Sequence, residues 1–112
     1  MEHSMKLRND AFNLIKDNIK TVEMRLCDQK RKLICIGDDI IFTNTKNNEI
    51  MKVKVVNLNK FNNFKELYNH YDKIQLGYLE NENATYTDMY EYYSKDQINK
   101  YGVLAIEIKK TL

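Results

Sequence analysis

The segment KTVEMRL, residues 20–26, alternates polar and apolar side chains with a period of two. Successive side chains of a β-strand point to opposite faces, so this alternation predicts a strand. The apolar row, which we expect in the core, comprises Val22, Met24 and Leu26. The polar row places an acid, Glu23, beside a base, Arg25, on the opposite face. That face is either a functional site or an ordinary solvated sheet surface with an exposed ion pair.

The residues before this segment predict a short strand and then a helix. HSMKLR, residues 3–8, alternates in the same way and is typical of a strand. Asn9 or Asp10 can cap the helix that follows. The inward face of this helix is expected to comprise Phe12, Ile15, Lys16 and Ile19. Asn18 is expected to end the helix in a left-handed conformation, since Asn tolerates it better than most residues.

A β-hairpin is predicted after the polar, turn-like stretch CDQKRK, residues 27–32. A turn at Gly37 precedes an apolar segment at residues 39–44, which predicts one strand. Apolar and basic residues alternate in EIMKVKVVNL, residues 49–58, which predicts a second, longer strand. The turn-forming residues of TKNNE separate the two strands, so they are expected to pair.

Two helices and a final strand are predicted in the rest of the chain. Large apolar and aromatic residues recur at intervals of three and four in residues 61–71 and again in 86–99, which is typical of amphipathic helices. Residues 72–85 carry no readable pattern. VLAIEIKK, residues 103–110, predicts a strand, and the apolar first half of this strand fits a central position buried on both faces.

This element order favours an α+β protein with a small mixed sheet, curled like a barrel, and helices at its rim. At 112 residues with 43% hydrophobic residues, the chain is expected to form a single domain, residues 1–112. No apolar run reaches the roughly 18 residues that span a membrane, and the N-terminal residues lack the apolar segment of a secretion signal. We therefore expect a cytoplasmic protein with no membrane partner.

Charge and cysteine content narrow the possible functions. The 18 basic and 16 acidic side chains give a formal net charge of +2, which argues against a histone-like or strongly electrostatic nucleic-acid binder. Cys27 and Cys35 are the only cysteines, and neither His3 nor His70 stands at a spacing that would complete a zinc site. We therefore expect two reduced thiols, no metal and no cofactor.

The order of these motifs resembles the ASCH family, a branch of the PUA-like fold. Family members look like a Met-x-Leu strand, a helix, the run Gly-x-Lys-Thr-x-Glu-x-Arg-Leu, a basic turn, and then Gly-Asp and a β-hairpin. The matching text covers residues 3–44 and 100–109. The matching positions are Met5, Leu7, Lys20, Thr21, Glu23, Arg25, Leu26, Asp28, Lys30, Arg31, Gly37 and Asp38. The glycine of the family motif is Asn18 here, the next best residue for a left-handed helix terminator.

The resemblance implies a PUA-like mixed β-barrel with peripheral helices and a cleft that binds RNA or a nucleotide-like ligand. The guanidinium fork of Arg25 suits a phosphate or a base edge, and Glu23 can accept a hydrogen bond from an exocyclic amine. Tyr93, or Tyr92 beside it, can stack on an unpaired base, although tyrosines at this spacing also suit a core. The expected binding residues are Lys6, Lys20, Glu23, Arg25, Lys30, Arg31 and Tyr93.

Two other functions stay open at this point. A small hydrolase acting on RNA or modified nucleosides, a ribonuclease or an amidohydrolase, would use Lys20 and Glu23 for proton transfer. A protein-interaction module would bind no ligand at this face. Small bacterial amidohydrolases that act on acetylated cytidine are similar in this region, but they carry a threonine, their proposed nucleophile, where this chain has Glu23. A carboxylate does not replace a hydroxyl nucleophile, so the resemblance does not imply that activity.

Overall fold

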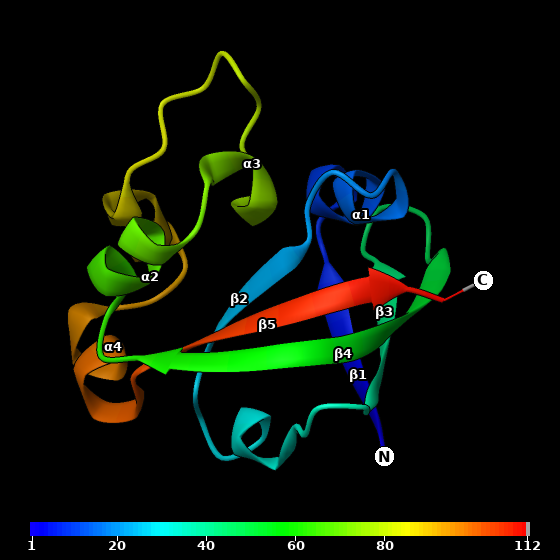
Figure 1. The fold of residues 1–112 in the computed structure, drawn as a ribbon, viewed down its shortest axis with the longest axis horizontal. Coiled ribbons are helices and arrows are strands. Elements are labelled where there is room, and N and C mark those ends of the chain that lie inside the picture. The colour runs from blue at the N-terminus through cyan, green and yellow to red at the C-terminus, as the bar shows by residue number, and fades with distance from the viewer. Residues whose placement is uncertain (112) are drawn as a thin grey trace.

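A computed structural model describes residues 1–111, and its central element is a curled five-stranded sheet (Figure 1). The strands are β1 (Glu2–Leu7), β2 (Val22–Leu26), β3 (Asp39–Asn44), β4 (Ile50–Phe61) and β5 (Val103–Lys110). They lie in the order β1-β3-β4-β5-β2. The β1–β3 pair is parallel, and the other neighbouring pairs are antiparallel. The predicted α+β class with a mixed, barrel-like sheet is therefore confirmed.

Strands β4 and β5 join the two halves of the sheet. β3 and β4 form the predicted hairpin, and β4 continues beyond the expected end to Phe61 because it also pairs with β5. A register shift between Val55 and Asn57 interrupts that pairing, and such bulges bend a strand. β5 lies between β4 and β2, and residues 103–106 are buried, as predicted for a central strand.

The helical segments lie at the rim of the sheet, as the resemblance implied. They are α1 (Asn9–Lys16), η1 (Arg31–Leu33), α2 (Phe64–His70), α3 (Lys73–Leu76), η2 (Tyr86–Glu91) and α4 (Lys95–Tyr101). Helix α1 lies on one side of β2, and the segment from α2 to α4 lies on the other (Figure 1). The η1 turn follows β2 at the end of this strand that lies away from α1 (Figure 1). Strand β2 thus runs between two groups of helices.

Apolar side chains form two buried clusters on opposite faces of the sheet. β5 shows the division, because Leu104 and Ile106 enter the first cluster, whereas Val103 and Ala105 enter the second. The first cluster also includes Phe12 of α1. The second cluster packs against α2, α3, η2 and α4, and its members from these elements are Phe64, Leu67, Leu76, Met89 and Ile98.

Both faces of β2 are enclosed. The apolar row joins the second cluster, which confirms its predicted place in the core; it comprises Val22, Met24 and Leu26. The polar row is not solvated, because Glu23 is only 6% exposed. The interpretation of this row as an ordinary wet sheet surface is therefore wrong for Glu23.

Helix α1 is shorter than its apolar spacing predicted. Arg8 precedes it without a side-chain hydrogen bond to the helix, so neither Asn9 nor Asp10 is the N-cap. The helix ends at Lys16, and Ile19 is 41% exposed and takes no part in the inward face. The inward face is formed by Phe12 and Ile15. Asn18 has a φ of 62°, which confirms the predicted left-handed turn into β2.

The helix predicted at residues 86–99 is broken in two. A 3-10 turn, η2, ends at Glu91, and α4 begins at Lys95. Ser94 starts the second helix, because its side chain accepts a hydrogen bond from the Gln97 amide while the Gln97 side chain accepts one from the Ser94 amide. Such a capping box provides acceptors for two backbone N–H groups at the start of a helix. In a continuous helix, these groups would donate to carbonyls of the preceding turn.

The helix predicted at residues 61–71 is present as α2 but starts later. β4 keeps the chain extended to Phe61. The Asn63 side chain then accepts a hydrogen bond from the Glu66 amide and caps the new helix. The capping residue, rather than the first aromatic residue, determines where the helix begins.

Cys27 is buried, Cys35 is exposed, and both are free thiols. Within residues 1–111, no group of three or more His, Cys, Asp or Glu side chains is placed to hold a metal ion. No helix in this part of the chain has both the length and the apolar character needed to cross a membrane.

Candidate ligand-binding cleft over strand β2

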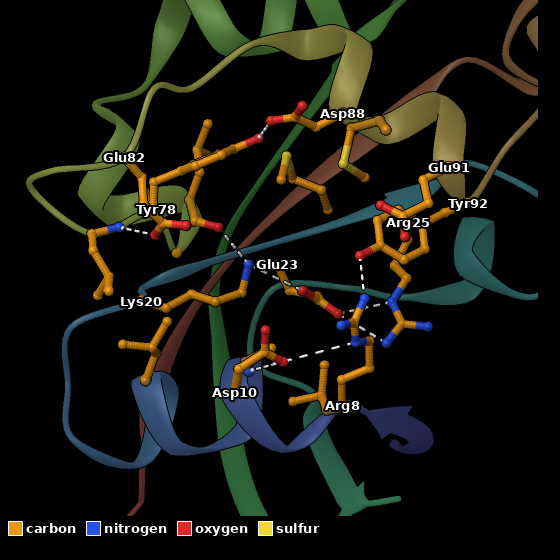
Figure 2. A pocket seen from close by; sticks show the side chains of 18 of the residues that line it. Arg8, Asp10, Lys20, Glu23, Arg25, Tyr78, Glu82, Asp88, Glu91 and Tyr92 are labelled. Atoms are coloured by element: carbon orange, nitrogen blue, oxygen red, sulfur yellow. Dashed lines mark hydrogen bonds and ion pairs between the residues drawn. The ribbon is translucent and has the colours of Figure 1, made fainter.

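A cleft of about 850 Å³ opens over β2, between α1 and the segment 68–93. Small-molecule sites typically have volumes of about 300–1,000 Å³. Lys20 and strand β2 supply the floor, α1 supplies one wall, and α3, η2 and the loop between them supply much of the other. Charged side chains from all three parts point into this space (Figure 2).

Glu23 lies between two cations on the cleft floor (Figure 2). Its Oε1 is 3.4 Å from Lys20 Nζ, and its Oε2 accepts a hydrogen bond of 2.9 Å from Arg25 Nε. Arg25 Nη2 lies 2.8 Å from the same Oε2. Lys20, like Glu23, is 6% exposed. The structure therefore brings together the three residues of the predicted cleft as an ion triad, in which Lys20 and Glu23 are buried and Arg25 is partly buried.

Two opposing effects determine the protonation of Glu23. Burial raises its pKa, because a poorly solvated site disfavours the charged form. The charges and hydrogen bonds of Lys20 and Arg25 more than offset burial, and the pKa stays below its ordinary value. Glu23 is therefore an ionised group that holds a proton poorly near neutral pH. This argues against the proton-transfer role that the hydrolase hypothesis assigns to it.

The end of α3 positions Lys20. The Lys20 ammonium donates a hydrogen bond of 2.7 Å to the Leu76 carbonyl, one of the carbonyls that a helix leaves unpaired at its C-terminus. The Thr21 amide donates to the Gln75 carbonyl at 3.0 Å and ties the start of β2 to the same helix. Gly77 follows with a φ of 105°, and a Cβ there would lie 2.9 Å from Lys20 Cδ. Glycine is therefore required both by the backbone and by the path of Lys20.

The floor keeps hydrogen-bonding capacity for a ligand. The contact of Glu23 Oε1 is the ion pair of 3.4 Å with Lys20, which leaves this oxygen capacity for a further donor, and among residues 1–111 no group accepts a hydrogen bond from Arg25 Nη1. The Lys20 ammonium has three N–H groups, of which one is hydrogen-bonded, to Leu76. Arg25 Nη2 is used internally, because it donates to the Lys6 carbonyl at 2.7 Å. The floor thus offers donors and an acceptor within one buried cluster.

The wall opposite α1 carries a chain of three hydrogen-bonding groups. The hydroxyls of Tyr68 and Tyr78 are 2.8 Å apart. Tyr78 also donates a bond of 2.7 Å to Asp88 (Figure 2). Burial raises the pKa of Tyr68 to about 12. Burial and the hydrogen bonds with Tyr68 and Asp88 raise the pKa of Tyr78 as well. Both hydroxyls are therefore protonated at neutral pH.

The loop after α3 is tied back to that helix. The Lys73 ammonium donates to the carbonyls of Glu80 and Glu82, at 2.8 and 2.6 Å. The Glu82 carboxylate accepts a bond of 2.6 Å from the Leu79 amide (Figure 2). These bonds hold the loop in place as part of the wall.

Arg8 and Tyr92 lie together at one end of the cleft (Figure 2). Arg8 Nη1 donates a bond of 2.6 Å to the Tyr92 hydroxyl. The neighbouring Tyr93 also lines the cleft, but its ring stacks on Phe64 with centroids 6.0 Å apart, and burial raises its pKa. One face of Tyr93 is therefore used within the protein. Tyr92 is 51% exposed and is the more accessible of the two for a ligand.

The predicted basic turn does not reach the cleft. Of the predicted binding residues, those that line it are Lys6, Lys20, Glu23, Arg25 and Tyr93. Lys30 donates instead to the Ser4 carbonyl at 3.0 Å, and Arg31 forms an ion pair of 3.1 Å with Asp28. Both residues lie outside the cleft because η1, which starts at Arg31 directly after Lys30, follows β2 at the end far from α1 (Figure 1).

Sequence reasoning missed the wall residues Arg8, Tyr68, Tyr78 and Asp88. A local signal was present for α3, because Asp72 and Gln75 form a capping box just before Gly77, a left-handed helix end. Nothing in the sequence pattern pairs Tyr68 with Tyr78, since that contact depends on how α2 and α3 fold against each other.

The cleft lining carries more acids than bases. Its four cationic side chains are Lys6, Arg8, Lys20 and Arg25, and its six carboxylates are Asp10, Asp17, Glu23, Glu82, Asp88 and Glu91. The formal excess is two negative charges, so the cleft as a whole does not attract a polyanion.

The ASCH domain family matches residues 5–112 of this chain. The structure is similar to the crystal structure of the hypothetical protein PH0355, with a TM-score of 0.86 and 32% identity over 99% of this chain and 100% of that one. The solution NMR structure of protein PF0455 from Pyrococcus furiosus has a TM-score of 0.70 and 33% identity, over 98% and 97% of the two chains. No curated protein matches the sequence significantly.

A more distant similarity extends to a mutant of ZmASCH from Zymomonas mobilis. Its crystal structure has a TM-score of 0.69 and 16% identity, over 96% of this chain and 67% of that one, and shows a shared fold. The family match spans the ion triad as well as the terminal strand. Together with the two structures that are similar along their whole length, it shows that this chain belongs to the ASCH domain family.

Proposed function

We propose that the cleft over β2 binds a single nucleobase, either of a free nucleoside or nucleotide or of an unpaired residue in RNA. The observation that carries this proposal is the ion triad of Lys20, Glu23 and Arg25, which keeps unused donors and acceptor capacity on the floor of a cleft of about 850 Å³. Base edges present donors and acceptors side by side, and such a mixed array matches them.

The ion pairs within the triad hold its donors and acceptor in place before a ligand binds. Lys20 and Arg25 each contact one oxygen of Glu23, and Glu23 in turn offsets the repulsion between the two cations by lying between them. Side chains that are already ordered lose little conformational entropy when a ligand arrives. A preorganised, buried cluster suits a small rigid base better than a flexible chain.

The net negative charge of the cleft lining favours binding of a base over binding of several phosphates. Six carboxylates against four cations would repel a polyanion that entered deeply. Phosphate groups of an RNA strand are therefore expected at or outside the rim, where Lys6 and Arg8 supply positive charge. The basic residues Lys30 and Arg31 would contact only a longer strand.

An NMR titration tests the proposal with adenosine, AMP and a six-nucleotide single-stranded RNA. All three ligands should shift the backbone amides of residues 20–25 and of Gly77, because these line or support the floor. The RNA is expected to shift the amides of Lys6 and Arg8 in addition and to leave those of Lys30 and Arg31 unchanged. If none of the three ligands shifts residues 20–25, the proposed site is wrong.

A matched pair of variants separates the cleft from the basic turn. Arg25→Lys keeps a positive charge beside Glu23 but removes the planar fork, so it should weaken adenosine binding about tenfold. Arg31→Lys makes the same exchange outside the cleft and should leave adenosine affinity unchanged. Equal effects of the two exchanges would show that the cleft is not where adenosine binds.

A further inference from the structure

The chain formed by Tyr68, Tyr78 and Asp88 determines what the cleft wall can offer a ligand. Each protonated tyrosine hydroxyl has one hydrogen to donate. Tyr78 lies 2.7 Å from a carboxylate oxygen of Asp88. A hydrogen bond to a charged acceptor is about twice as strong as one between neutral groups, so Tyr78 gives its hydrogen to Asp88. The Tyr68 hydroxyl, 2.8 Å from that of Tyr78, must then give its own hydrogen to Tyr78.

This arrangement leaves Tyr68 as an acceptor without a free hydrogen. Tyr68 lines the cleft, so its remaining lone pair is available to a bound molecule. We propose that Tyr68 selects ligands that present an N–H donor to this wall, such as the exocyclic amine of a nucleobase, and that Tyr78 and Asp88 enforce the selection by fixing the direction of the hydrogens. The proposal rests on the proposed function and adds which edge of the base is recognised.

The wall, rather than the floor, is expected to discriminate between ligands. The floor offers donors from Lys20 and Arg25 and an acceptor at Glu23 Oε1, so it can pair with either kind of group. Tyr68 offers only an acceptor. A ligand that placed an acceptor against it would lose a hydrogen bond and bring two oxygen or nitrogen lone pairs together.

Three purine ribosides that differ at position 6 test this selection by isothermal titration calorimetry. Adenosine carries an amine there, purine riboside a hydrogen atom, and 6-methoxypurine riboside an acceptor oxygen. The protein should bind adenosine about tenfold more tightly than 6-methoxypurine riboside, with purine riboside between them.

Two variants should free the Tyr68 hydrogen for a ligand, each by removing a different group of the hydrogen-bond chain. In Tyr78→Phe, Tyr68 has no partner for its hydrogen and can donate to the ligand, so the preference for adenosine should fall to about twofold or less. In Asp88→Ala, the acceptors left to Tyr78 are the Thr85 carbonyl at 3.5 Å and the nearer Tyr68 hydroxyl at 2.8 Å, so Tyr78 can donate to Tyr68 and free the Tyr68 hydrogen in the same way. Asp88 is exposed, so this second variant keeps the packing of the wall.

Tyr71→Phe is the matched control, because the Tyr71 hydroxyl also donates to a carboxylate, that of Glu107 at 2.8 Å, but does not line the cleft. It should keep the preference for adenosine. An unchanged preference in both Tyr78→Phe and Asp88→Ala would overturn the proposal, and so would equal binding of the three ribosides to the unmodified protein. If neither the ribosides nor single-stranded RNA binds the cleft, the proposed function itself fails.

Discussion

The side chain of Lys20 passes so close to Gly77 that a Cβ at position 77 would lie 2.9 Å from Lys20 Cδ. The same glycine ends α3 with a φ of 105°, a conformation that other residues adopt only with strain. Lys20 reaches the Leu76 carbonyl and Glu23 along this path. The position of one floor cation therefore depends on the absence of a side chain on the opposite wall.

Gly77→Ala should lower both stability and ligand affinity. Left-handed strain and the contact with Lys20 together should reduce the free energy of unfolding by about 2–4 kcal/mol, measured by urea denaturation. Gly37→Ala is the control, because Gly37 has a φ of 95° but open space where its Cβ would be. It should lose only the strain, about 1 kcal/mol. Equal losses at the two positions would show that Lys20 does not depend on Gly77.

Glu23→Gln should be strongly destabilising. Without the carboxylate, Lys20 becomes a buried cation and Arg25 a partly buried one, neither with a counter-charge, and breaking a buried pair typically costs about 3–5 kcal/mol. Glu49→Gln removes an ion pair of 2.7 Å with Lys16 on the surface and should cost less than about 1 kcal/mol. Chemical denaturation at pH 7 compares the two. A small loss at Glu23 would mean that the triad is not a buried network.

The stability of the fold should fall in acid through Asp38. This carboxylate accepts hydrogen bonds from His3 and the Cys35 amide and pairs with the N-terminal amine; together these lower its pKa from 3.8 to about 2. A carboxyl with a lowered folded pKa contributes stability above its unfolded pKa, and this contribution is lost as the pH falls through the folded value.

Asp38→Asn should therefore be less stable than the unmodified protein at pH 7, and the difference should shrink as the pH falls from about 4 to about 2. Thermal unfolding of both proteins across this range measures the difference. A difference that stays constant with pH would show that the Asp38 charge does not contribute.

The sequence predicted the floor of the cleft well and its wall poorly, for a physical reason. A strand fixes which side chains share a face, so the spacing of Glu23 and Arg25 was enough to place them side by side. Lys20 precedes β2, and it was the resemblance to the ASCH family that implied its place in the cleft. The contact between Tyr68 and Tyr78 joins α2 to the loop after α3 and depends on tertiary packing. The spacing of residues along the sequence also did not predict that the η1 turn places Arg31 outside the cleft.

The broken helix at residues 86–99 shows a different limit. Aromatic residues kept a helical spacing across the break, because several of them pack against the same cluster from η2 and from the segment after it. The local signal was the pair Ser94 and Gln97, three residues apart, which forms a capping box. The capping residues therefore indicated the break between the two helices, whereas the aromatic periodicity did not.

Ser94→Ala should accordingly destabilise the protein by about 1 kcal/mol, because the Gln97 amide loses its acceptor at 3.1 Å. Ser94→Asp retains an acceptor at this position and should stay within about 0.5 kcal/mol of the unmodified protein. Urea denaturation of the two variants gives both values. A loss in Ser94→Asp as large as that in Ser94→Ala would show that the side-chain cap does not stabilise α4.

Ionic strength should affect RNA binding only weakly. Six carboxylates and four cations line the cleft, and the rim offers Lys6 and Arg8 to phosphates, so a strand should neutralise about two charges or fewer. The logarithm of the association constant for the six-nucleotide RNA should then fall with the logarithm of salt concentration with a slope no steeper than about −1.4. Adenosine, which has no phosphate, should show almost no salt dependence. A much steeper slope for the RNA would mean that it tracks a basic surface such as the turn at Lys30, rather than placing one base in the cleft.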